Sequence, residues 1–181
     1  MDEQLAFVKH IVQRLTSAGI EYMMTGSMPM AVYATPRMTR DIDLVVDVGE
    51  EDIDTLVSLF ESDCYIARQA VVEAIRTHGM FNIIHNDWII KADFIVRKPG
   101  PYRQTEFERR RQIDIQGLSV AVVAPEDLIL SKLEWMSQTG SELQRRDVRE
   151  ILAAGVALDW PYLEEWSKHL GIGRLLDEVK K

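Results

Sequence analysis

The sequence has almost no cysteine, no excess of positive charge and no long apolar run. Its single cysteine, Cys64, excludes an internal disulfide and a zinc site built from several cysteines. The formal net charge is −8, which is unfavourable for a protein that binds long nucleic acid nonspecifically. No stretch approaches the roughly 18 apolar residues that span a bilayer. The N-terminal MDEQLAFVKH has no apolar signal core, so we expect a cytoplasmic protein without a membrane or long double-stranded DNA as partner.

The composition is that of a folded chain with a hydrophobic core. Apolar residues make up 46 % of the sequence and charged residues 28 %. Strand and helix patterns alternate up to residue 123, whereas the pattern from Pro125 onward is helical throughout. We therefore predict an α+β fold, with a mixed β-sheet flanked by helices. A domain would span residues 1–123, and a C-terminal helical segment packed on it would span residues 124–181.

The expected elements follow from hydrophobic spacing and from turn residues. Helices are expected over 3–18, 29–34, 52–60 and 69–77, then from Pro125 with breaks near Gly140, Gly155 and Gly171. Strands are expected over 22–24, 41–47, 65–67, 81–85, 88–96, 112–115 and 118–123. Asn86-Asp87 and Gln116-Gly117 are each expected to form a hairpin turn.

Asp41 and Asp43 occupy alternate positions at the start of an expected strand, in RDIDLVV. Residues two apart in a strand point to the same face, so the two carboxylates would lie side by side. They repel each other, and a divalent cation removes this conflict by taking their oxygens as ligands. Mg²⁺ suits such a site because it prefers carboxylate, phosphate and water oxygens. Two solvated aspartates at a strand end are the alternative that this pattern alone leaves open.

Gly26-Ser27 precedes these acids and follows the short strand expected over 22–24. A glycine lets the backbone approach a ligand closely, and the helix opening after it would present N–H groups to an anion. The Ser27 hydroxyl can donate to a phosphate or cap that helix. A plain turn with a cap explains the pair in isolation. Combined with Asp41 and Asp43, it predicts a phosphate site next to a metal site.

A third acid, Asp93, lies inside the otherwise apolar run WIIKADFIV. A carboxylate in the middle of a strand is costly to bury unless it is paired or bound to metal. A salt bridge to Lys91 or to an arginine would satisfy it. The other interpretation is a third metal ligand beside Asp41 and Asp43.

These motifs together resemble the nucleotidyltransferase superfamily related to DNA polymerase β. The resemblance rests on Gly26-Ser27, the short helix after it, the segment RMTRDIDL from Arg37 to Leu44, and the later strand containing Asp93. The segments APEDLILSKLEW and RRDVREI further resemble small bacterial members found in toxin–antitoxin and abortive-infection systems.

The resemblance implies a magnesium-dependent transfer reaction. Asp41, Asp43 and Asp93 would be both catalytic residues and ligands of two Mg²⁺ ions, with Mn²⁺ as an alternative. Asp93 would also help to deprotonate the acceptor hydroxyl. Gly26 and Ser27 would bind the β- and γ-phosphates of an NTP, and pyrophosphate would leave.

Three basic residues are further candidates for nucleotide binding: Arg37, Arg40 and Lys132. For each of them, a solvated surface charge is the alternative. For the cluster Arg109-Arg110-Arg111 the choice is between a solvated face and an anion or RNA contact. The four histidines show no metal-ligand spacing.

Two kinds of function remain open. The first is an enzyme that transfers an NMP from an NTP to a hydroxyl of an RNA end, a protein side chain or a small molecule. The second is an inactive nucleotidyltransferase-like module that binds nucleotides or a partner, as part of a toxin–antitoxin system. Retention of all three acids favours the enzyme. A sugar transferase or phosphatase of another Asp-x-Asp type is disfavoured because Gly-Ser precedes the acids. Acceptor choice would depend on the helical tail, a homo-oligomer or a partner protein.

Overall fold

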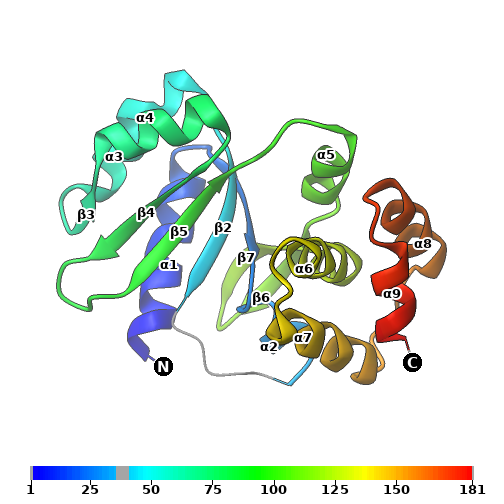
Figure 1. Ribbon diagram of the computed structural model, residues 1–181. Helices are drawn as coiled ribbons and strands as arrows, with labels where there is room; N and C mark the ends of the chain where they lie inside the picture. Colours follow the sequence, from blue (N-terminus) through cyan, green and yellow to red (C-terminus); the bar gives the residue numbers. More distant parts are fainter. Residues whose placement is uncertain (1, 36–40, 181) are drawn as a thin grey trace.

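A mixed sheet with helices on both faces forms the computed structural model of the chain, which describes residues 2–35 and 41–180 (Figure 1). Among these residues the sheet has seven strands in the order β3-β4-β5-β2-β1-β7-β6. The strands are β1 (Glu21–Thr25), β2 (Ile42–Asp47), β3 (Cys64–Ile66), β4 (Met80–His85), β5 (Lys91–Val96), β6 (Arg111–Ile115) and β7 (Leu118–Val122). β2 is antiparallel to β1 and parallel to β5, so the sheet is mixed as predicted.

Helices lie on both faces of this sheet. They are α1 (Asp2–Ser17), α2 (Met30–Tyr33), α3 (Ile53–Phe60), α4 (Arg68–Thr77), α5 (Pro101–Glu108), α6 (Pro125–Thr139), α7 (Glu142–Ala153), α8 (Trp160–His169) and α9 (Gly173–Val179). Helices α1, α3 and α4 cover what we call the α1 face, and α5 and α6 lie against the opposite one, the α6 face (Figure 1). No helix among the described residues is both long and apolar enough to cross a membrane.

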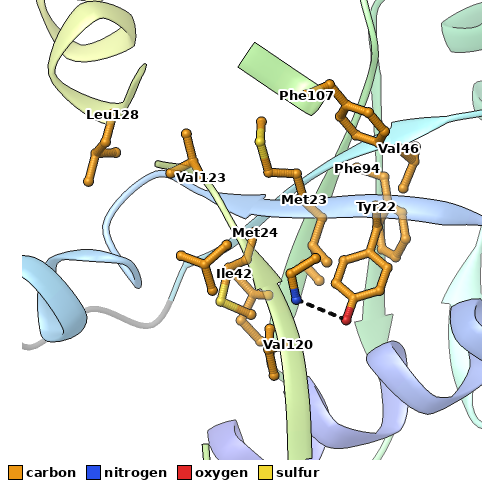
Figure 2. Packing of buried hydrophobic residues seen from close by; sticks show 14 of the residues in the cluster. Tyr22, Met23, Met24, Ile42, Val46, Phe94, Phe107, Val120, Val123 and Leu128 are labelled. Atoms are coloured by element: carbon orange, nitrogen blue, oxygen red, sulfur yellow. Dashed lines mark hydrogen bonds between the residues drawn. The ribbon is translucent and has the colours of Figure 1, made fainter. Parts of the chain in front are cut away.

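The alternation of side chains along the central strands builds the two faces. On the α1 face, the ring of Phe94 in β5 lies 5.6 Å from the ring of Phe60 in α3. Figure 2 shows Tyr22 and Met23 on opposite sides of β1, as expected for successive strand residues. The Tyr22 hydroxyl accepts a hydrogen bond of 3.3 Å from the backbone N–H of Ala121 in β7, which ties the two strands together. Because successive strand residues point to opposite faces, the residues of β2 and β5 that alternate with those on the α1 face lie on the α6 face. These include the polar side chains of the two strands.

Most of the predicted elements are present, with three differences. β5 begins at Lys91 rather than Trp88, because Ile89 adopts a positive φ of 53° within a longer turn. The sequence analysis did not predict α5, which starts at Pro101 directly after the Pro-Gly break. Ser27 does not cap α2, since the N-cap position is Pro29 and no side chain caps it.

The C-terminal helices are joined to the rest of the chain through α6. Its first six residues, 125–130, are all buried, and one hydrophobic cluster includes both Leu128 of α6 and Met24 of β1. Arg109 adds a polar link: it pairs with Glu126 at 3.0 Å and Asp127 at 3.1 Å and lies over the Tyr162 ring of α8. The predicted boundary between residues 123 and 124 stays a prediction.

Candidate active site

The centre of the site is a pair of carboxylates on neighbouring strands. The parallel register of β2 and β5 pairs Asp43 with Asp93, and the antiparallel register of β1 and β2 pairs Asp43 with Thr25. Residues in register point to the same face of a sheet and are close neighbours. Asp41, immediately before β2, is exposed and acts electrostatically on Asp43. The structure therefore brings the three predicted acids together on the α6 face.

The site changes the protonation of Asp43. Burial, together with the charges of Asp93 and Asp41, raises its pKa from 3.8 to about 6. Lys91 and Lys132 act in the opposite direction. A carboxyl in this state is neutral in mildly acidic solution and is anionic, but poorly stabilised, at neutral pH.

Asp93 is buried, with 6 % of its surface exposed. Its Oδ2 accepts a hydrogen bond of 2.6 Å from Nζ of Lys91, two residues earlier on the same face of β5. The predicted salt bridge to Lys91 is therefore present. Its other oxygen, Oδ1, is buried and has no hydrogen-bond partner among the described residues. A buried carboxylate oxygen without a partner is costly, and a bound cation would satisfy it.

Gly26 packs directly against Asp43. A Cβ added at Gly26 would lie 2.7 Å from Cγ of Asp43, closer than real side chains approach. Gly26 also has a φ of +71°, in the region that favours glycine. The backbone of Gly26 therefore makes its predicted close approach to the Asp43 carboxylate. The absence of a side chain at Gly26 leaves room for this carboxylate.

Replacing Gly26 by alanine is therefore expected to displace Asp43 and to weaken Mg²⁺-dependent nucleotide binding. The matched control is Gly19→Ala, because Gly19 has nearly the same φ, +69°, but nothing within 4 Å of the added Cβ. Both variants should lose about 1 kcal/mol through the strained φ. Only Gly26→Ala should also lose the increase in melting temperature given by MgATP. Equal behaviour of the two variants in this thermal-shift measurement would contradict the assigned contact.

Ser27 and the basic candidates have different positions. Ser27 is buried, and its carbonyl accepts from the N–H of Met30 at 3.1 Å. Helix α2, which follows, has only four residues, so its dipole contributes less to an anion site than the sequence analysis assumed. Arg37 and Arg40 lie outside the described residues.

Lys132 is buried in α6 rather than solvated. Its Nζ donates to Oδ2 of Asp147 at 2.6 Å and to Oε1 of Gln144 at 3.2 Å, both in α7. Its charge nevertheless reaches Asp43, whose pKa it lowers. Lys132 is therefore fixed near the carboxylates by a buried ion pair.

The residues present suit a divalent cation. Two carboxylates in register and a third nearby supply hard oxygen ligands, which Mg²⁺ prefers. The Asp93 oxygen without a partner and the mutual repulsion that raises the pKa of Asp43 are both relieved by a cation. Lys91 supplies one positive charge to the same cluster.

A second cluster with ligand-type side chains lies elsewhere. His10, Asp63 and His85 present ligand atoms within 4.8 Å of one another. Both oxygens of Asp63 accept hydrogen bonds of 2.7 Å from Arg14, whose guanidinium also lies 3.2 Å from Nε2 of His10. Nδ1 of His85 accepts from the backbone N–H groups of residues 87 and 88. A metal would have to displace Arg14, so we interpret this cluster as an ion-pair network.

The arginine cluster 109–111 is paired internally. Arg109 and Arg111 both face Glu126, at 3.0 and 3.7 Å. Arg110 pairs with Glu21 at 3.0 Å and lies over the ring of Phe107. These contacts join β6, α5 and α6, and they account for the cluster without an RNA ligand.

Two kinds of residue in this region were not predicted from the sequence. Asp147, the buried partner of Lys132, was not identified, although it shares one face of α7 with Ile151, which the spacing could have revealed. Glu106 and Glu134 were also missed. They pair with Arg103 beside the α6 face. Glu106 lies three residues after Arg103 on α5, whereas no local pattern connects Glu134 in α6 with this pair.

The fold is that of nucleotidyltransferases. No protein-family model and no curated protein matches the sequence. Among solved structures, the antibiotic-resistance factor ANT(2'')-Ia aligns with a TM-score of 0.61 and 14 % identity, over 98 % of this chain and 96 % of that one. A protein from Thermotoga maritima assigned as a nucleotidyltransferase gives 0.57 and 18 %, over 81 % and 92 %. An antigenic nucleotidyltransferase-like protein from Paracoccidioides brasiliensis gives 0.56 and 20 %, over 85 % and 76 %.

These similarities confirm the predicted fold class, and they confirm the resemblance to nucleotidyltransferases at the level of the fold. A second structure of ANT(2'')-Ia is a complex with adenylyl-2''-tobramycin and aligns with a TM-score of 0.61 and 12 % identity. It covers 94 % of this chain and 97 % of that one. At such identities the roles of individual residues in this chain follow from its own geometry.

Proposed function

We propose that the chain is a Mg²⁺-dependent nucleotidyltransferase that moves an NMP from an NTP to a hydroxyl acceptor. The observation that supports this best is the register of Asp43 with Asp93 beside Gly26, on a nucleotidyltransferase fold. This arrangement combines adjacent carboxylates, a buried oxygen in need of a cation and a glycine turn at the end of a strand. ANT(2'')-Ia, which binds an adenylylated antibiotic, provides a precedent for a small acceptor on this fold.

The proposed role of each residue follows from its position in the candidate active site. Asp41, Asp43 and Asp93 would hold the metal, which when bound supplies positive charge to the triphosphate and to the reacting oxygens. Gly26 and Ser27, at the end of β1, would bind the β- and γ-phosphates. Asp93 would accept the proton of the acceptor hydroxyl, and Lys132 would contribute positive charge near Asp43.

NTP binding provides the first test. The melting temperature of the protein is measured with each of the four NTPs, with and without Mg²⁺, in the wild type and in the double variant Asp41→Ala/Asp43→Ala. We expect Mg²⁺-dependent stabilisation in the wild type only, because binding to the folded state raises its stability. Persistence of that stabilisation in the double variant would refute the metal site.

Transfer assays distinguish an enzyme from a binding module. The protein is incubated with α-³²P-labelled NTPs, Mg²⁺ and a bacterial cell extract, and the labelled products are separated. An enzyme gives labelled product that disappears in Asp93→Ala. Mg²⁺-dependent NTP binding without any product would instead support the inactive module. The predicted connection with toxin–antitoxin systems stays a prediction.

Lys91 offers a further prediction about the metal. Its ammonium group contacts Asp93 and acts on Asp41 and Asp43, so it opposes a second cation. Lys91→Met is expected to bind Mn²⁺, measured by electron paramagnetic resonance, about tenfold more tightly than the wild type. Lys9→Met in α1, on the opposite side of the sheet, serves as the control. Weaker binding in Lys91→Met would show that Lys91 supports the metal site instead.

A further inference from the structure

A cavity of about 230 Å³ lies on the α6 face next to the carboxylates. Its wall on the sheet side is formed by Met23, Val45 and Ile95, one strand repeat beyond Thr25, Asp43 and Asp93. The opposite wall is formed by α5 and α6, including Phe107, Ser131, Trp135 and Gln138. We call this space the β1–α6 cavity. Met23, whose side chain points to the same side of β1 as Phe107, is visible in Figure 2.

We propose that the β1–α6 cavity is the acceptor site and that it takes a small molecule with a hydroxyl group on a ring. This inference rests on the proposed transfer reaction, whose geometry determines where the acceptor lies. In an in-line displacement the attacking and leaving oxygens are on opposite sides of the reacting phosphorus. Gly26 and Ser27 lie at one end of the carboxylate cluster, where pyrophosphate would leave. The β1–α6 cavity lies at the other end, where the acceptor must enter.

The same geometry gives a balanced step. The acceptor oxygen forms a bond to the α-phosphorus while the bond from that phosphorus to the bridging oxygen breaks. Pyrophosphate leaves with the electron pair, and the hydroxyl proton passes to the carboxylate of Asp93. Asp93 is suited to this role because it lies two residues before Ile95 on the same face of β5, and Ile95 lines the cavity.

The lining determines what kind of acceptor fits. Met23, Val45 and Ile95 offer an apolar surface, and the ring of Trp135, 55 % exposed, offers a stacking surface on α6. Polar contacts come from Thr25 in the same lining. A flat or puckered ring with polar substituents matches these walls.

The charged part of the lining consists of Arg97, Lys98, Arg103, Glu106 and Glu134. Arg103 pairs with Glu106 at 2.7 Å and with Glu134, and Ser131 donates to Glu106 at 2.6 Å. Glu106 is buried, which raises its pKa. Arg97 pairs with Asp47 at 3.0 Å. The lining thus has three basic and two acidic residues, an excess of only one positive charge, and fits a neutral or weakly charged ring.

The size of the cavity argues against a polynucleotide. Sites for drug-sized ligands typically measure about 300–1,000 Å³, so 230 Å³ suits a compact molecule. The net charge of −8 also disfavours a long anionic chain. An acceptor of one or two rings is the class that remains.

Variants that fill the cavity test this assignment. Gln138→Trp places a large side chain at its exposed edge, and Val45→Phe reduces its sheet wall. The control is Ser137→Trp, which adds the same side chain one position away on α6, at an exposed residue outside the lining. Each variant is incubated with α-³²P-labelled NTPs, Mg²⁺ and either the low-molecular-weight or the macromolecular fraction of a bacterial extract. NTP binding is measured in parallel by thermal shift.

We expect label in the low-molecular-weight fraction. Transfer should fall about a hundredfold in Gln138→Trp and Val45→Phe. Their Mg²⁺-dependent stabilisation by NTP should equal that of the wild type and of Ser137→Trp. Label confined to RNA or protein, label unaffected by either filled variant, or NTP binding without label in any fraction would overturn the assignment. Absence of NTP binding in the wild type would refute the proposed function itself. That result is seen in the thermal shift, whereas failure of the acceptor assignment is seen in the transferred label.

Discussion

Replacing Asp43 by asparagine is expected to stabilise the metal-free protein and, at the same time, to abolish Mg²⁺-dependent nucleotide binding. In the wild type, burial and the charges of Asp93 and Asp41 raise the pKa of Asp43 to about 6. Holding this carboxylate ionised at neutral pH therefore costs folding free energy. Asparagine removes the charge, keeps the shape, and can donate its amide to the buried oxygen of Asp93. We expect a gain of about 1–3 kcal/mol in the free energy of unfolding at pH 7.5.

The raised pKa of Asp43 determines how the stability gained in Asp43→Asn changes with pH. The folded-state pKa of Asp43, about 6, lies above its ordinary value of 3.8, so the folded protein binds the proton more tightly than the unfolded chain. The stability linked to this proton is complete below pH 3.8, falls between pH 4 and 6, and stays constant above. The stability difference between Asp43→Asn and the wild type should grow over that interval. Urea unfolding at several pH values in the presence of EDTA measures it.

Bound Mg²⁺ is expected to favour the wild type over Asp43→Asn. Mg²⁺ needs the ionised carboxylate, so protonation below pH 6 should compete with Mg²⁺ binding to the wild type. Asp43→Asn should show no stabilisation by MgATP at any pH and should lose transfer activity by about a thousandfold or more. Asp87→Asn, an exposed acid in the β4–β5 turn, is the control and should change neither quantity. An Asp43→Asn protein less stable than the wild type in EDTA would contradict the electrostatic account.

Local sequence patterns predicted the central part of the fold. The alternation in RDIDLVV gave both the strand and the shared face of its acids, because strand periodicity depends only on neighbouring residues. Gly140 and Gly171 ended helices as expected, since a positive φ is available to glycine at little cost. The turn at Gln116-Gly117, in which both residues have positive φ, was predicted for the same reason.

These local patterns did not predict the contacts between segments that are distant in the sequence. The pairing of Asp43 with Asp93 depends on strand order, which periodicity does not specify; the family resemblance implied only that the three acids share one site. Lys132 was proposed as a phosphate contact, and its burial beside Asp147 became visible only when α6 and α7 were packed together. Arg103 in α5 likewise meets Glu134 in α6 across two helices. Each of these requires tertiary packing, which single-residue propensities do not specify.

The buried pair of Lys132 and Asp147 is expected to contribute strongly to stability. The two side chains are 5 % and 1 % exposed, and their charged atoms lie 2.6 Å apart. Asp147→Ala leaves the ammonium group of Lys132 buried without its carboxylate, which typically costs about 3–5 kcal/mol. The exposed pair of Arg146 and Glu150 on the same helix is the control, and Glu150→Ala should leave stability unchanged. Urea unfolding in EDTA compares the two variants.

A double variant separates the structural role of Lys132 from its proposed role toward the nucleotide. Lys132→Met/Asp147→Leu removes both charges and fills similar volume, so most of the lost stability should return. Removal of Lys132 also removes a charge that lowers the pKa of Asp43, and hence a charge that favours a bound anion near the metal site. We expect the refolded double variant to bind MgATP about tenfold more weakly than the wild type, measured by calorimetry at pH 7.5. If the two proteins bind MgATP with equal affinity, Lys132 has only a structural role, the contact between α6 and α7. If stability is restored but MgATP binding is weaker, Lys132 both joins the two helices and supports nucleotide binding.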